Sequence, residues 1–123
     1  MPETLNRIAE FYLSALKEPV LDPSRWGAFI HDNVTYTGPN RDGQGLAHLA
    51  SALASVHRHF PGIEQLRVFV GQDELCVVSE AHSADPTLTS ERIVDWIQVR
   101  EHRISSVSRI YDARTIERIT SEI

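Results

Sequence analysis

The residue of this sequence that most needs a chemical explanation is Asp95, in the middle of the stretch Glu91 to Val99. The stretch is rich in β-branched residues and lacks glycine and proline, which is typical of a β-strand. Apolar residues occupy both of its faces, which predicts a central strand covered on each side. An ionised carboxylate away from water is costly unless it is paired, hydrogen-bonded or protonated. Asp95 is therefore a candidate functional residue.

Two structural roles compete with that interpretation of Asp95. It could pair with an arginine such as Arg92 or Arg109, or it could be exposed on an outer face. Strand alternation puts Asp95 on one face with Ile93 and Ile97, and Trp96 on the opposite face. A large apolar side chain exposed there would mark a surface for a partner.

Other reactive side chains give weaker signals. His57 and His59 are two residues apart in a predicted helix and point in different directions, so they do not predict a metal site. The single cysteine, Cys76, excludes a disulfide framework within the chain and a zinc site built from several cysteines. Its apolar strand predicts a small buried side chain rather than a nucleophile. We expect no metal and no cofactor.

The composition describes an ordinary globular chain, 123 residues long with 41% hydrophobic and 24% charged residues. One domain spanning residues 1–123 is the simplest organisation. A formal net charge of −5 argues against nucleic acid or an anionic membrane surface as the partner. No signal peptide is evident and no apolar run approaches the ~20 residues that span a bilayer, so the expectation is a cytoplasmic protein.

Periodicity predicts helices over residues 4–17 and 46–60, a short helix starting at Pro23, and another over residues 114–123. Strands are expected over residues 34–37, 63–70, 75–83, 91–99 and 104–111, with residues 38–45 as a loop. This order indicates an α+β fold in which helices cover one face of a strongly curved, mostly antiparallel sheet. The result is a cone whose interior could hold a small molecule. Candidate lining residues, which could equally be core, are Trp26, Phe29, Tyr36, Ile97 and Tyr111.

Landmarks spread over nearly the whole chain resemble the nuclear transport factor 2-like (NTF2-like) superfamily, within it the SnoaL-like and ketosteroid-isomerase-like branch. They are Phe11 to Leu16, His31 to Tyr36, Gly45 opening a helix that ends near Phe60 and Pro61, Val94 to Ile97, and Ile110 to Asp112. The resemblance implies a cystatin-like α+β roll. Function does not follow, because this fold hosts enzymes and plain binding modules alike.

The resemblance also implies roles for particular residues. Tyr12 and Asp95 stand where ketosteroid isomerases have two hydrogen-bond donors to a developing enolate. The position of the isomerase base is Gly38, so the base is missing and steroid isomerisation is not implied.

SnoaL-like polyketide cyclases pair an acid in the penultimate strand with a histidine on the strand before it. His82 occupies that preceding strand here. A hairpin centred near Leu88 and Thr89 would place His82 almost opposite Asp95.

The resulting hypothesis is a cofactor-free acid/base catalyst, a cyclase or isomerase, acting on a hydrophobic carbonyl compound. Asp95 would be the acid/base or donor, Tyr12 a second donor and His82 an auxiliary group. The alternative is a non-catalytic module that binds an apolar ligand or serves as a dimeric partner domain. The resemblance further implies a homodimer through the outer sheet face around Trp96.

Overall fold

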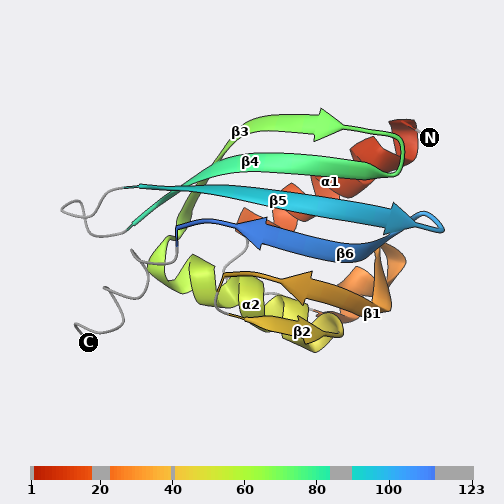
Figure 1. Ribbon diagram of the computed structural model, residues 1–123, viewed down its shortest axis with the longest axis horizontal. Helices are drawn as coiled ribbons and strands as arrows, with labels where there is room; N and C mark the ends of the chain where they lie inside the picture. The colour runs from red at the N-terminus through yellow and green to blue at the C-terminus, as the bar shows by residue number, and fades with distance from the viewer. Residues whose placement is uncertain (1, 18–22, 40, 84–89, 113–123) are drawn as a thin grey trace.

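The computed structural model describes residues 2–17, 23–39, 41–83 and 90–112. The elements follow the chain as α1 (Pro2–Lys17), the 3₁₀ helix η1 (Pro23–Ala28), β1 (Ile30–Thr37), β2 (Asp42–Gln44), α2 (Leu46–His59), β3 (Gly62–Val70), β4 (Glu74–His82), β5 (Glu91–Arg100) and β6 (Arg103–Ile110). The six strands form one curved sheet in the order β2-β1-β6-β5-β4-β3 (Figure 1). Neighbouring strands are antiparallel except for β1 and β6, which are parallel. The predicted α+β fold is confirmed.

Both long helices are amphipathic and cover the same face of the sheet (Figure 1). In α1, Leu5, Ile8 and Leu16 are buried in the core. The helix α2 begins after Gly45, whose positive φ of 102° suits glycine, and its backbone carbonyl accepts a hydrogen bond from Leu49 N at 3.1 Å. None of the helices in the described ranges is long and apolar enough to cross a membrane.

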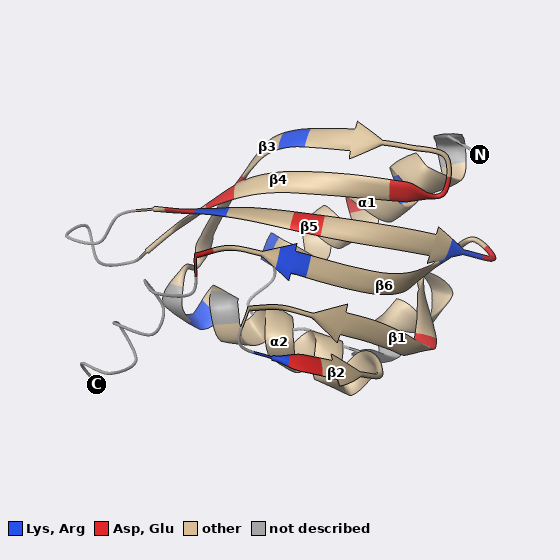
Figure 2. Cartoon of the chain, viewed as in Figure 1, with Lys and Arg blue, Asp and Glu red and all other residues tan. Residues whose placement is uncertain are grey.

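Alternation along β4 and β5 separates an inner from an outer sheet face. Buried residues occur at every second position of β5, from Glu91 through Asp95 to Ile97, while Trp96 is exposed on the other face. In Figure 2 an acidic band in the middle of β5 lies beside a basic band near the end of β6, and another basic band lies within β3. The predicted orientation of Asp95 toward the core is confirmed.

Some elements differ from the sequence-based expectation. β1 starts at Ile30 rather than residue 34, and the expected loop over residues 38–45 contains the short strand β2. Glu91 pairs with Ala81, which places Asp95 opposite Val77 instead of His82. The expected helix at residues 114–123 lies outside the described residues.

Candidate functional site

Asp95 forms a buried ion pair with Arg109, which faces it across the β5–β6 ladder. Arg109 Nε donates to Asp95 Oδ1 at 2.7 Å, and Nη2 donates to Oδ2 at 3.1 Å. The exposed fractions are 0% for Asp95 and 3% for Arg109. Arg92 pairs instead with Glu80, at 3.2 Å on the surface. Of the alternatives for Asp95, the ion pair with Arg109 is therefore the one observed.

The pair balances two charges that neither side chain could carry alone in the interior. Burial by itself would lower the pKa of Arg109, but the Asp95 carboxylate together with Tyr12 and Tyr36 outweighs burial, so the pKa of the guanidinium is raised overall. Bidentate contact of this kind is the strongest arrangement available to an arginine and a carboxylate. Both Asp95 oxygens accept hydrogen bonds from the guanidinium, whereas an enolate donor would have to be a protonated acid.

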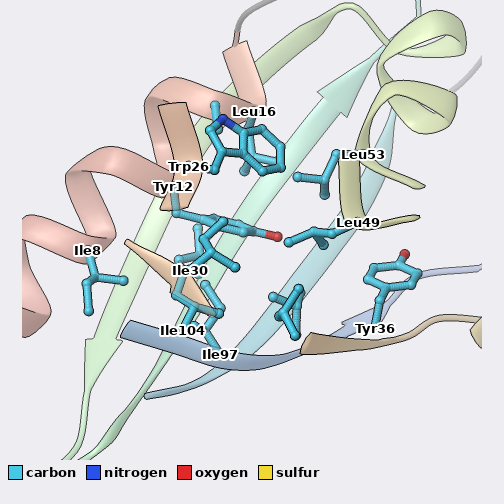
Figure 3. Packing of buried hydrophobic residues seen from close by; sticks show 14 of the residues in the cluster. Ile8, Tyr12, Leu16, Trp26, Ile30, Tyr36, Leu49, Leu53, Ile97 and Ile104 are labelled. Atoms are coloured by element: carbon cyan, nitrogen blue, oxygen red, sulfur yellow. The ribbon is translucent and has the colours of Figure 1, made fainter. Parts of the chain in front are cut away.

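Tyr12 extends from α1 into the middle of the core (Figure 3). It is 1% exposed, and its hydroxyl has no hydrogen-bond partner among the described residues. Burial, and next the charge of Asp95, raise the pKa of Tyr12 well above its usual value. The phenol therefore stays protonated. It lies beside the Asp95–Arg109 pair as a hydrogen-bond donor, but none of the described residues offers it a well-aligned acceptor.

Two more tyrosines and a serine complete the polar surroundings. Burial is the main cause that raises the pKa of Tyr36 to about 12, although Arg109 opposes it. Burial also raises the pKa of Tyr111. Ser79, on the inner face of β4, has a buried hydroxyl with no partner among the described residues. The site thus contains neutral hydroxyl groups around one neutralised ion pair.

His82 is not part of this cluster. Its side chain is 50% exposed, and Nε2 lies 3.3 Å from Glu64 Oε2 on β3. The predicted placement opposite Asp95 is wrong because the β4–β5 register pairs Asp95 with Val77. Residues at an odd spacing from Val77 on β4 also point to the opposite face of the sheet.

The predicted lining residues divide between core and surface. Trp26, Tyr36 and Ile97 belong to the closed hydrophobic cluster shown in Figure 3. Phe29 is half-buried and stacks on Phe11, with ring centroids 4.4 Å apart. Tyr111 is half-buried against a smaller cluster formed by Phe60, Ala81 and Ile93. In the described part of the chain the inside of the cone near Tyr12 is therefore packed with side chains.

Ser79 was missed by sequence reasoning, although its spacing of two from Val77 on an alternating strand could have placed it on the inner face. Among the described residues, no three His, Cys, Asp or Glu side chains are grouped as a metal site would require. The absence of a metal and of a cofactor remains a prediction.

The outer sheet face carries two neighbouring rows of apolar side chains. In one row, Cys76 lies between Phe69 and Trp96. In the next row, Val78, Val94 and Ile110 are paired across β4, β5 and β6. Phe69, Trp96 and Ile110 are 55%, 40% and 59% exposed. These six residues form the outer apolar patch.

Comparison with known proteins supports the fold and goes no further. No family model matches the sequence, and no curated protein matches it. A de novo designed protein with a curved β-sheet is similar, with a TM-score of 0.79, 14% identity, and coverage of 98% of this chain and 95% of that one.

Natural proteins with the same fold include one from a Jannaschia species assigned as a SnoaL-like polyketide cyclase. Its TM-score is 0.72 at 13% identity, covering 91% of this chain and 90% of that one. An NTF2-like protein of unknown function from Cytophaga hutchinsonii has a TM-score of 0.67 at 12% identity, and the match covers 89% of this chain and 91% of that one. This chain therefore has the fold of the NTF2-like and SnoaL-like proteins, as the resemblance predicted. Since a designed protein shares it, the fold alone does not define an activity.

Proposed function

We propose that this protein is a non-catalytic binding module that takes an uncharged, mostly apolar small molecule into its cone. The observation that carries the proposal is the Tyr12 hydroxyl, which is buried and protonated and interacts with Asp95, but makes no well-aligned hydrogen bond with any of the described residues. Buried polar groups in native proteins are rarely left unsatisfied, and an absent ligand or water is the usual explanation. A ligand carbonyl oxygen would accept the hydrogen bond.

The Asp95–Arg109 pair supports binding over acid/base catalysis. Both carboxylate oxygens already accept hydrogen bonds from the guanidinium. Moving a proton onto Asp95 would leave Arg109 without its counter-charge in the interior, which is costly. The same balance favours an uncharged ligand, because an added charge beside a neutralised pair would have no counterion. That natural neighbours of this fold include a protein assigned as a polyketide cyclase supports a carbonyl compound.

Access to Tyr12 requires a rearrangement of the core. Trp26 is 4% exposed and packs in the same cluster as Tyr12, Leu49 and Leu53 (Figure 3). Trp26 is supplied by the 3₁₀ helix η1, which has six residues against 16 in α1 and 14 in α2. We propose that the ligand enters by displacing the Trp26 indole.

The test compares three related compounds by calorimetry: α-tetralone, which has a carbonyl; tetralin, which lacks it; and 1-naphthoate, which is charged. Wild type should bind α-tetralone about 2- to 10-fold more tightly than tetralin, the value of one neutral hydrogen bond. Tyr12→Phe should abolish that difference and leave tetralin binding unchanged, while 1-naphthoate should bind least. Equal preference in wild type and Tyr12→Phe, or no binding of either neutral compound, would refute the proposal.

A second proposal concerns the outer apolar patch, which we assign to a homodimer interface. Its two rows together extend across β3, β4, β5 and β6 and contain no charged side chain; Arg67, beside the patch on β3, lies over the Phe69 ring with its guanidinium carbon 5.7 Å from the ring centroid. An exposed apolar surface of this kind usually marks a partner, and an uncharged patch suits contact with its own copy.

Sedimentation velocity tests the dimer, with Trp96→Asp as the disrupting variant. Asn33→Asp, which adds the same charge at an exposed position of β1, is the matched control. Wild type and the control should sediment as dimers and Trp96→Asp as a monomer. Alkylation of Cys76, which lies in the patch, should be slower in the dimeric wild type than in the monomeric Trp96→Asp variant. Monomeric wild type at all concentrations would rule the interface out.

A further inference from the structure

A hollow lies where the start of α1 meets the β3–β4 and β5–β6 turns. Its volume is about 280 Å³, and it is lined chiefly by Thr4, Leu5, Asp73, Arg100, Glu101 and His102. None of these residues belongs to the Tyr12 site. Pockets for small ligands usually measure about 300–1,000 Å³, so its occupant would be a small molecule.

The β5–β6 turn that forms one wall has an unusual backbone. Arg100 pairs with Arg103, which leaves Glu101 and His102 as the two turn residues, and both have positive φ, 53° and 66°. Turns of this type strongly favour Asn-Gly or similar pairs, because other side chains are strained there. Strained residues of this kind concentrate at binding sites, where the surrounding structure holds them in place.

Hydrogen bonds from neighbouring elements fix the backbone on both sides of the β5–β6 turn. Val99 N donates to the Asp73 carbonyl at 2.9 Å, which ties the turn to the β3–β4 connection. Buried His31 donates from Nε2 to the Arg100 carbonyl at 2.6 Å. Arg103 Nη1 donates to the Gly27 carbonyl at 3.3 Å. The side chains of Glu101 and His102 are thus presented from a fixed backbone.

Charges of both signs surround the hollow without neutralising one another. The side chains of Asp73, Arg100, Glu101 and His102 form no ion pair or hydrogen bond with any residue in the described ranges. The amide groups in the first turn of α1, near Thr4, add partial positive charge. Buried Leu5 and half-buried Val99 supply an apolar wall.

From this arrangement we propose that the hollow binds a zwitterionic small molecule, an α-amino acid with an apolar side chain. Its carboxylate interacts with Arg100 and the first turn of α1, and its ammonium group with Asp73 and Glu101. Its apolar side chain rests on Leu5 and Val99. A ligand that carries both charges bridges groups of opposite sign that the protein itself leaves apart, whereas a singly charged ligand meets repulsion from one set.

The experiment is an NMR titration of the whole chain, following backbone amides, with L-leucine as the probe. Two leucine fragments serve as matched compounds: 4-methylpentanoate, which lacks the ammonium group, and 3-methylbutylammonium, which lacks the carboxylate. Leucine should produce saturating shifts at Thr4, Leu5, Asp73 and residues 99–102. Each fragment should bind at least tenfold more weakly.

Variants separate binding from folding. Arg100→Gln should weaken leucine binding at least tenfold, while Arg92→Gln, a change to another exposed arginine of β5, should leave it unaltered. Glu101→Asn combined with His102→Gly should raise the thermal midpoint, because it relieves the turn, and yet abolish the shifts. No saturating shift with leucine up to 20 mM, equal responses to leucine and both fragments, or unchanged binding in Arg100→Gln would overturn the proposal.

Discussion

Removing the guanidinium of Arg109 should be among the most damaging single changes to this fold. Arg109→Met keeps an unbranched apolar stem but leaves the Asp95 carboxylate, 0% exposed, without its two hydrogen bonds. Breaking a buried ion pair by removing one partner costs about 3–5 kcal/mol. That is a large share of the roughly 5–15 kcal/mol that stabilises a typical domain. Replacing both partners, as in Asp95→Leu with Arg109→Met, removes the uncompensated charge and should restore stability to within about 1 kcal/mol of wild type or above it.

Urea unfolding followed by tryptophan fluorescence measures both variants against wild type, with a thermal scan as a second readout. Each lost kcal/mol should lower the midpoint by roughly 2–8 °C for a domain of this size range. Arg92→Met, which breaks the exposed pair with Glu80, is the control and should cost less than about 1 kcal/mol. If Arg109→Met costs no more than this control, or if the double variant is as unstable as the single one, the description of a buried and coupled pair is incorrect.

Other perturbations test the remaining features of the core. The pKa of Tyr36 is raised to about 12 from an ordinary value near 10, so an unfolded chain loses this proton first and stability should fall as pH rises from about 10 to about 12. Measured by urea unfolding over that pH range, the free energy of unfolding should fall less steeply for Tyr36→Phe than for wild type. An equally steep fall would assign the pH dependence to other groups. A Cβ at Gly43 would overlap the His48 ring, so Gly43→Ala should cost about 1–3 kcal/mol, and His48→Ala added to it should recover most of the loss in the same assay. Trp26→Ala should cost about 3–5 kcal/mol and should gain more thermal stability from α-tetralone than wild type does; an unchanged or smaller gain would speak against ligand entry at the indole.

The sequence was most informative where burial and periodicity act together. Alternation along β5 placed Asp95 inward and Trp96 outward, and both orientations are observed. The same reasoning offered Arg109 as a possible partner for Asp95, since a buried carboxylate needs a counter-charge. It left Arg92 open as well, although the same alternation puts Arg92 and Asp95 on opposite faces of β5; that Arg109 lies directly opposite Asp95 follows only from the β5–β6 register.

Register and short elements were beyond the reach of the sequence. The position of His82 depended on where the β4–β5 connection turns, and the polar segment between these strands has no residue that fixes it. β2 has only three residues, one of them Gly43, and shows no hydrophobic alternation. Trp26 could line a cavity or fill the core, because both environments select the same apolar side chain.

Binding without acid/base chemistry is the central claim, and hydrogen exchange at a bound ketone tests it most directly. α-Tetralone dissolved in D₂O loses the protons next to its carbonyl only as fast as an acid or base removes them, and NMR follows their loss. With Asp95 held by Arg109, the protein should leave the exchange rate at its buffer value even at saturating protein concentration. Exchange accelerated by wild type and abolished in Asp95→Asn would contradict the account and show that Asp95 acts as a catalytic acid/base.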